Sequence, residues 1–147
     1  MTTGAMNIAE IEVGFELPSI SWPMSLGHMR LFSGWPGLNK YGHDEVNQHT
    51  SNEVAKKLGR PAPIVAGPQM LACLEEMLIN FFGVDWFTGG KIDAHYVGVL
   101  LAGDTITTSV TVTDKVQEGG KTRLEMEVWG ENQRQAKVVV GSASFTK

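Results

Sequence analysis

The densest group of side chains able to do chemistry lies in Tyr41–Gly59, which reads YGHDEVNQHTSNEVAKKLG. Two of the four histidines of the chain, His43 and His49, stand here beside Asp44 and Asn47. A carboxylate and an imidazole can share proton transfer near neutral pH, because the pKa of an imidazole lies close to that pH. A His in a polar loop is more often a solvated side chain. The segment is therefore either a solvated loop or an acid–base site.

The sequence does not indicate other kinds of reactive site. The histidines lack metal-binding spacing, one cysteine cannot form a thiolate cluster, and there is no glycine-rich phosphate loop. Neither a metal nor an organic cofactor is implied. Cys73 falls in an apolar segment without a base nearby and is interpreted as a core residue. His95 is interpreted as a packing residue, and His28 and Arg30 as members of surface ion pairs.

Composition bounds the class of protein. The chain has 147 residues, 42% hydrophobic and 19% charged, with a formal net charge of −4. This size predicts a single domain over residues 1–147. No basic patch indicates nucleic acid, no segment has the ~20 apolar residues of a membrane span, and the first residues do not form a signal peptide. A single cysteine fits a reducing compartment, so the predicted location is the cytoplasm.

The elements that must position the reactive loop are short in the first half of the chain. Residues 8–17 are rich in β-branched side chains and predict a first strand that ends at Pro18. Two short helices are predicted, in 25–34 and 50–59, because glycines end both and Thr50, Ser51 and Asn52 offer N-caps to the second.

The second half predicts one long helix followed by a sheet. Apolar residues recur at helical spacing over Gln69–Phe82, on two sides, which indicates a buried central helix. Period-two patterns then predict four strands, in residues 92–101, 105–113, 122–130 and 136–145. This order favours an α+β domain whose antiparallel sheet wraps the helix. One helix cannot cover both faces of the sheet, so pairing with a second copy is expected.

Several short sequence motifs of this chain together resemble those of the MaoC-like dehydratases, which include the (R)-specific enoyl-CoA hydratases and have a hot-dog fold. The resemblance covers residues 17–145. It is carried by LFSG, by Asp44 with His49-Thr50, by EVAKKLG, by APIVAG and, more weakly, by VLLAGDTI, where GDT is also an ordinary turn.

The resemblance implies an acid–base pair and a carbonyl-binding backbone group. Asp44 and His49 have the spacing of the family's Asp and His, which add or remove water across an α,β double bond. Gly67 matches the glycine whose N–H polarises the thioester carbonyl, although it can also simply allow a tight helix entry. Pro68 has no N–H and cannot add a second donor at that point.

The loop departs from the family pattern. Trp35 stands where an Asp usually follows Ser-Gly, and WPGLNKYGH intervenes before the His. A second register aligns Asn47 with a family Asn, which leaves Asp44 as a nearby carboxylate only. Tyr41 and His43 are then reserve candidates. Trp35 and Leu38 are expected at the mouth of the acyl pocket.

The expected function is that of a hydratase or dehydratase, a lyase of fatty acid or polyketide metabolism that acts on an acyl thioester of coenzyme A or of a carrier protein. The expected assembly is a homodimer. Two alternatives stay open. One is a thioesterase, isomerase or cyclase of secondary metabolism in the same pocket, and the other is a non-catalytic acyl-binding subunit.

Overall fold

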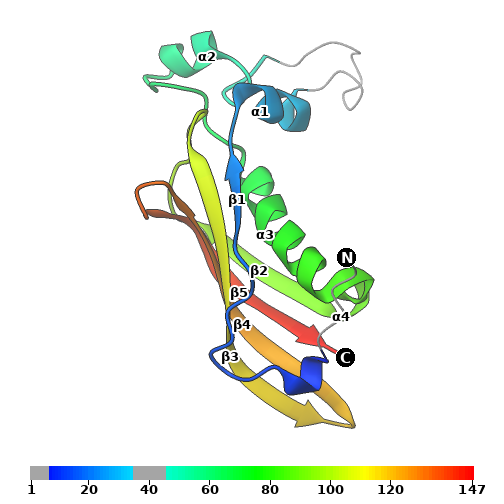
Figure 1. Ribbon diagram of the computed structural model, residues 1–147. Helices are drawn as coiled ribbons and strands as arrows, with labels where there is room; N and C mark the ends of the chain where they lie inside the picture. Colours follow the sequence, from blue (N-terminus) through cyan, green and yellow to red (C-terminus); the bar gives the residue numbers. More distant parts are fainter. Residues whose placement is uncertain (1–6, 35–45) are drawn as a thin grey trace.

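The computed structural model describes residues 7–34 and 46–147. A five-stranded antiparallel sheet, in the order β1-β3-β4-β5-β2, packs with one face against a long helix, α3 (Figure 1). The strands are β1 (Ile20–Pro23), β2 (Gly90–Tyr96), β3 (Thr105–Glu118), β4 (Lys121–Asn132) and β5 (Lys137–Thr146). The predicted antiparallel α+β architecture is confirmed.

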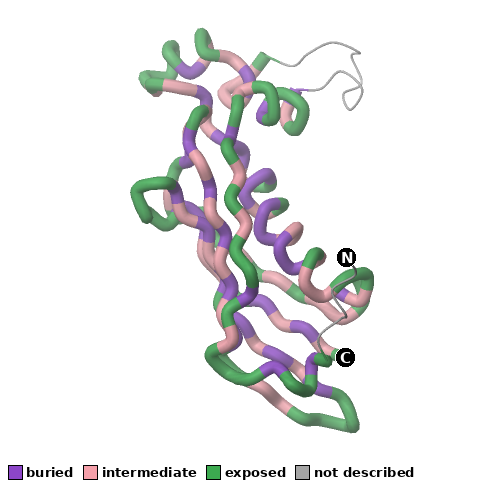
Figure 2. Tube along the Cα trace, viewed as in Figure 1, coloured by how far each residue is buried: buried purple, intermediate pink, exposed green. Residues whose placement is uncertain are grey.

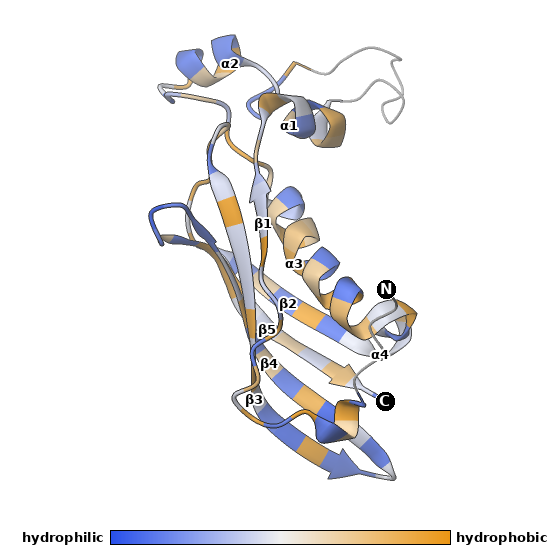
Figure 3. Cartoon of the chain, in the orientation of Figure 1, coloured by the Kyte–Doolittle hydropathy of each residue, from blue (hydrophilic) through white to orange (hydrophobic). Residues whose placement is uncertain are grey.

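Helix α3 (Gly67–Phe82) begins two residues before the predicted start. Its buried stripe includes Met70, Leu74, Met77 and Leu78, each at most 3% exposed. These side chains face the sheet, and Figure 2 shows the buried positions gathered on that side of the helix. Figure 3 shows that the helix is mostly apolar with a few hydrophilic positions. The predicted central helix is confirmed.

The sheet shows the alternation that its sequence predicts. In β4, Leu124, Met126 and Val128 are buried and lie between less buried neighbours. β3 and β4 pair along almost their whole length, and both are longer than the predicted strands. Their hairpin lies at the end of the molecule opposite to α1 and α2 (Figure 1).

The first strand predicted, in residues 8–17, is wrong. Its start is a 3-10 helix, η1 (Ile8–Glu10), whose Ala9 N–H is capped by the side chain of Asn7, and only Glu16 forms an isolated bridge, to Thr111. The regular strand begins later, at Ile20. The apolar residues of this segment reach the core without a ladder, because Ile11 and Leu17 are buried from irregular backbone.

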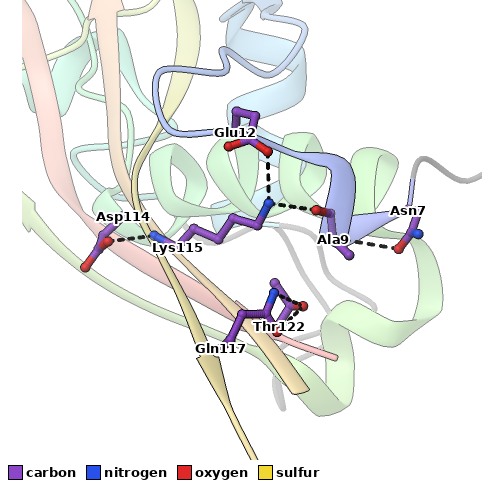
Figure 4. A network of polar contacts seen from close by, with 7 residues as sticks. All are labelled: Asn7, Ala9, Glu12, Asp114, Lys115, Gln117 and Thr122. Atoms are coloured by element: carbon purple, nitrogen blue, oxygen red, sulfur yellow. Dashed lines mark hydrogen bonds and ion pairs between the residues drawn. The ribbon is translucent and has the colours of Figure 1, made fainter. Parts of the chain in front are cut away.

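A lysine of the sheet holds this irregular segment. Lys115 Nζ donates to the carbonyl of Ala9 at 2.7 Å and to Glu12 Oε1 at 3.2 Å (Figure 4). Its side chain is only 16% exposed, so these bonds are partly shielded from water. The contact attaches the N-terminal segment to β3.

The strand predicted in residues 92–101 ends earlier, at Tyr96. Beyond it, Gly98 passes so close to the backbone of β5 that an added Cβ would lie 2.9 Å from the carbonyl oxygen of Lys137. The chain then reaches Leu101, which bridges to Ile64 instead of continuing the ladder with β5. β2 is an edge strand, paired only with β5 in the described part of the chain.

Two short helices lie beyond one end of the sheet (Figure 1). α1 (Leu26–Ser33) and α2 (Asn52–Lys57) are capped by the hydroxyl groups of Ser25 and Ser51, which accept from the N–H groups of residues 28 and 54. Both helices are confirmed. The chain is completed by η2 (Gly83–Asp85) and by α4 (Trp86–Gly89), which leads into β2. No helix of the described residues is long and apolar enough to cross a bilayer.

Candidate functional site

His49 lies in a hydrogen-bonded turn just before α2. The side-chain oxygen of Asn47 accepts the His49 N–H at 2.7 Å, and the hydroxyl of Thr50 accepts the Asn47 N–H at 2.9 Å. Asn and Thr side chains form such local bonds readily, which is why they favour turns over helices. The turn therefore fixes the backbone from which the imidazole projects.

A backbone carbonyl orients the imidazole. His49 Nδ1 lies 2.8 Å from the carbonyl oxygen of Ile64, and because a carbonyl can only accept, Nδ1 carries the hydrogen. In the neutral ring the lone pair is then on Nε2, which makes Nε2 the basic nitrogen. The side-chain nitrogen of Gln48 lies 3.5 Å from Nε2, at the outer limit of a hydrogen bond. His49 itself is half-buried.

The segment that supplies this carbonyl is fixed on both sides. Ile64 N–H donates to the Gln48 carbonyl at 3.2 Å, which returns a bond to the histidine turn. On its other side the segment pairs with the chain after β2, because Val65 N–H donates to Leu100 and Ala102 N–H donates to Pro63, both at 2.8 Å. Two residues after Val65 the same segment becomes α3.

Gly67 is the first residue of α3, and its N–H points out of the helix start. The first N–H groups of a helix have no acceptor within it, and the described residues provide none for Gly67. A Cβ at this position would lie 2.7 to 2.9 Å from the ring of Tyr96, at the end of β2. The glycine is required here because a ring packs on it. The site therefore combines His49, the Ile64 carbonyl, the Gly67 N–H and Tyr96.

No protein-family model matches the sequence, and no curated protein matches it. Solved structures do match. The (R)-hydratase PhaJ1 from Pseudomonas aeruginosa superposes with a TM-score of 0.71 at 19% identity, over 93% of this chain and 82% of that chain. A MaoC-like dehydratase from Rhodospirillum rubrum gives 0.72 at 16% identity, over 94% and 93%. The chain has the hot-dog fold.

A third hot-dog structure is a complex of two subunits. The 3R-hydroxyacyl-ACP dehydratase HadBC from Mycobacterium tuberculosis superposes with a TM-score of 0.65 at 16% identity, over 97% of this chain and 99% of that chain. At these identities the likeness shows the fold. The hot-dog architecture predicted from the sequence is confirmed.

Several predicted site residues lie outside the described residues. These are Trp35, Leu38, Tyr41, His43 and Asp44.

Asn47 is described, and both polar atoms of its side chain are bonded to backbone. Its oxygen accepts from His49 N–H, and its nitrogen donates to the Ser33 carbonyl at 3.2 Å. In this structure the imidazole is held by Ile64, and Asn47 shapes the turn and attaches it to α1.

The remaining candidates have structural roles or exposed positions. Arg30 Nε donates to the Thr50 carbonyl at 3.0 Å, so it binds the histidine turn and forms no ion pair within residues 7–34 and 46–147. His28 Nδ1 is 3.5 Å from the Pro23 carbonyl. The side chain of His95 is 73% exposed, and its Nε2 lies 3.7 Å from Asp93 Oδ1. The interpretation of His95 as a packing residue is therefore wrong.

Cys73 is a core residue, as predicted, and is 7% exposed. Burial raises the pKa of its thiol to about 11, and the negative charge of Glu76 adds to the effect. A thiol with such a pKa is a poor nucleophile near neutral pH. Among the described residues no three His, Cys, Asp or Glu side chains gather as metal ligands would.

The GDT turn has a buried carboxylate that sequence reasoning did not single out. Asp104 is 7% exposed. One carboxylate oxygen accepts from Leu101 N–H at 2.9 Å, and the other accepts from Gln133 Nε2 at 2.6 Å. The Asp104 carbonyl also accepts from Met24 N–H at 2.8 Å. The turn therefore joins the end of β1 to the segment that pairs with Ile64.

Tyr96 and the Ile64 carbonyl are the parts of the site that the sequence did not indicate. Every residue has a backbone carbonyl, so no residue type marks the one that binds His49. Tyr96 reads as an ordinary strand residue, and only the tertiary structure brings its ring to Gly67. The sequence signal for this close contact was Gly67, the glycine that ends APIVAG.

Proposed function

We propose that this hot-dog protein is a hydratase or dehydratase that adds or removes water across the α,β double bond of an acyl thioester, with His49 as an acid–base group. The observation that carries the proposal is the bond from His49 Nδ1 to the Ile64 carbonyl. It leaves Nε2 as the basic nitrogen, as proton transfer requires. Hot-dog neighbours named as hydratases and dehydratases support the reaction class.

In the hydration direction His49 Nε2 takes a proton from water while the water oxygen bonds to Cβ. The electron pair of the double bond moves toward the thioester carbonyl, where negative charge develops. The Gly67 N–H at the start of α3 stabilises this charge, since donors and the helix dipole both favour an anion there. A proton is then delivered to Cα, so that the elements of water are added in full.

Asp44 is proposed as the second acid–base group, as its spacing from His49 in the sequence suggests. It would share the proton transfers with the imidazole, one group acting at the oxygen and the other at Cα. The substrate carrier is proposed to be coenzyme A or a carrier protein. The proposed location is the cytoplasm.

A homodimer is proposed with its sites near the boundary between subunits. β2 presents an edge strand, and Tyr96, Val97 and Val99 at its end are 47%, 56% and 60% exposed. Exposed edges and apolar surface of this kind are usually covered. Because Tyr96 packs on Gly67, a partner on this edge would stand beside the site.

The test measures turnover with crotonyl-CoA and longer enoyl-CoAs, followed by loss of absorbance of the conjugated double bond. His49→Ala is expected to lower turnover by ~10² to 10⁴, the usual contribution of a positioned acid or base. The fold should survive, because His49 is a half-buried turn residue. Glu53→Ala, an exposed change in the first turn of α2, is the matched control.

Asp44→Asn keeps the shape of the side chain and removes its charge. A loss of similar size would place Asp44 beside His49 in the reaction, whereas a small loss would mean that the imidazole works with another group. Release of free thiol without loss of the double bond would replace this proposal with thioester hydrolysis. Full activity of both variants on a substrate that the wild type hydrates would overturn the assignment.

A further inference from the structure

Gln48, the residue before His49, lies between the imidazole and an arginine. Its side-chain nitrogen is 3.5 Å from His49 Nε2, and its side-chain oxygen accepts from Arg60 Nη1 at 2.5 Å. Gln48 and Arg60 are both half-buried. Gln48 therefore reaches the nitrogen that acts as the base in the function proposed above.

The end of α2 fixes the backbone of Arg60. Gly59 follows the helix with a φ of 72°, a left-handed conformation that glycine adopts without strain. The Gly59 N–H donates to the Lys56 carbonyl at 3.0 Å. The Arg60 N–H donates to the Ala55 carbonyl at 2.9 Å, which completes the pair of bonds that closes many helices. The Arg60 side chain therefore projects from a defined point at the end of α2.

Arg60 determines which way the amide of Gln48 faces. A guanidinium can only donate, so the amide atom that meets it is the oxygen. A flipped amide would set two donors against each other at Arg60, so the NH₂ group faces His49 Nε2. Within residues 7–34 and 46–147, no carboxylate forms an ion pair with Arg60 and competes with Gln48 for it.

Both nitrogens of the imidazole then meet partners that select the same tautomer. The Ile64 carbonyl accepts from Nδ1, and the Gln48 NH₂ group can donate only to an Nε2 that carries no hydrogen. At 3.5 Å the contact of Gln48 with Nε2 is long and therefore weak. The amide is thus free to donate to the oxygen of a water molecule that binds at Nε2.

We propose that Gln48 is a positioning residue of the acid–base site and that Arg60 sets its orientation. The oriented amide keeps Nε2 as a hydrogen-bond acceptor in the absence of substrate, and it donates to the oxygen of the water or substrate hydroxyl that meets Nε2. The role in turnover rests on the function proposed above, whereas the state of the imidazole is measured without substrate.

The first test reads the imidazole of His49 by long-range ¹H–¹⁵N NMR of the full chain near neutral pH. The chain has four histidines, and His49→Gln assigns the ring. In the wild type, Nδ1 should give the signal of a nitrogen with a hydrogen, and Nε2 that of a nitrogen without one. Gln48→Glu replaces the donor with a carboxylate that can only accept, so Nε2 should then carry a hydrogen in most molecules.

Variants of Arg60 test whether it acts through Gln48. Arg60→Met removes the donor and frees the amide to flip, so the Nε2 signal should move partway toward that of Gln48→Glu. Arg60→Lys keeps a cationic donor and should restore most of the wild-type signal. In a Gln48→Leu chain, Arg60→Met should cause no further change. Lys57→Met removes an exposed cation from the last turn of α2 and is the matched control.

The second test is turnover in the enoyl-CoA assay. Gln48→Leu should lower kcat about fivefold, the usual worth of one hydrogen bond. Gln48→Glu should lower it roughly 10- to 100-fold, because a bond to a charged group is stronger and must be broken before Nε2 can accept a proton. KM should change little in both variants, since the amide meets the base and the water.

Three results would overturn the proposal. The same Nε2 signal in the wild type, Gln48→Leu and Gln48→Glu would mean that the amide does not act on the imidazole. Equal effects of Arg60→Lys and Arg60→Met would mean that donation from residue 60 does not orient the amide. Unchanged kcat in Gln48→Leu, with His49→Ala inactive, would mean that the amide does not position the water.

Failure of the proposed function would give a different result. Full turnover of His49→Ala would overturn the acid–base assignment and the role of Gln48 in turnover. The Nε2 signals would still decide whether Arg60 orients the amide toward the imidazole.

Discussion

At the scale of single residues, the candidate site depends on main-chain groups that can only accept or only donate a hydrogen bond. The Ile64 carbonyl can only accept, so it decides which nitrogen of His49 bears the hydrogen. The Gly67 N–H has no acceptor within α3, because it lies at the start of the helix. The Tyr96 ring limits residue 67 to glycine.

Gly67→Ala tests that steric limit. The added Cβ would lie 2.7 Å from the Tyr96 ring, so the ring must move, and we expect turnover to fall by up to ~10²-fold through misplacement of the substrate carbonyl. The free energy of unfolding should fall by only about 1 kcal/mol, since Tyr96 is 47% exposed and its ring can move aside. Turnover and urea unfolding provide the two measurements.

The double variant Gly67→Ala with Tyr96→Ala supplies the control. Removing the ring makes room for the new methyl group, so the double variant should be no worse than Tyr96→Ala alone. If Gly67→Ala retained wild-type turnover in an active enzyme, the N–H at this position would not be involved in binding the carbonyl.

Cys73 provides a prediction on reactivity and pH. Burial raises its pKa from 9.0 to about 11, so at pH 8 the native chain has about a hundredfold less thiolate than the unfolded chain. Alkylation by iodoacetamide should be slower in the native protein by at least that factor and should appear on unfolding in urea. The chain has one cysteine, so the mass shift is unambiguous.

The sign of the pH dependence follows from the same shift. The native state holds its thiol proton up to a higher pH than the unfolded state does, so this group stabilises the fold fully below about pH 9. That contribution is lost as the pH rises toward about 11. Fast alkylation of the native protein at pH 8 would show that the thiol is reached by solvent.

At the scale of elements, the periodicity of apolar residues predicted the regular helix and strands that bury one side. Helical spacing indicated α3, and alternation indicated β3 to β5, most regularly in β4, because each of these elements buries one side. The segment of residues 8–17 has the composition of a strand but packs through single side chains such as Ile11 and Leu17. Composition alone does not distinguish these two ways of burial.

The residues of the candidate site could be proposed from the sequence only where a residue type marks them. His49 and Gly67 were indicated by the sequence motifs that contain them. The bond between His49 and Ile64 could not be indicated in this way, because it spans 15 residues and uses a main-chain atom. The role of Asp104 was hidden for a similar reason, because Asp is also the usual residue of a turn.

Asp104→Ala tests how that turn supports the site. The change leaves Leu101 N–H and Gln133 without their acceptor, so we expect a loss of about 1 to 3 kcal/mol in the free energy of unfolding. Denaturant unfolding measures it. Glu131→Ala, at a half-buried position in β4, is the control and should change the free energy by about 0.5 kcal/mol or less. Equal stability of the two variants would mean that the turn holds without its carboxylate.

At the scale of the whole molecule, one face and one edge of the sheet are the surfaces on which the proposed homodimer depends. α3 covers one face, and β2 leaves an edge with the exposed side chains of Val97 and Val99. Homodimers commonly form through such self-complementary surfaces. The edge lies beside Gly67, so assembly and activity are expected to depend on the same surface.

Sedimentation equilibrium should show a species of twice the chain mass of 16.0 kDa at micromolar concentration. Val97→Asp places a charge on the exposed end of this edge and should weaken the dimer at least ~10-fold, since a charge without a partner is costly to desolvate. Val84→Asp, at a residue that is 78% exposed in η2, is the matched control. A wild-type chain that sediments as a stable monomer would contradict the expectation.

The Ile64 peptide group has one further consequence, for how precisely the site is held. Its N–H binds the carbonyl of Gln48 and its carbonyl binds the imidazole of His49, and three residues later the same backbone becomes Gly67. A displacement of this backbone is therefore expected to carry the imidazole proposed as the base and the N–H proposed to bind the carbonyl in the same direction. Main-chain bonds set the position of His49 relative to Gly67. A change of side chain at position 64 is therefore expected to leave that relative position unchanged.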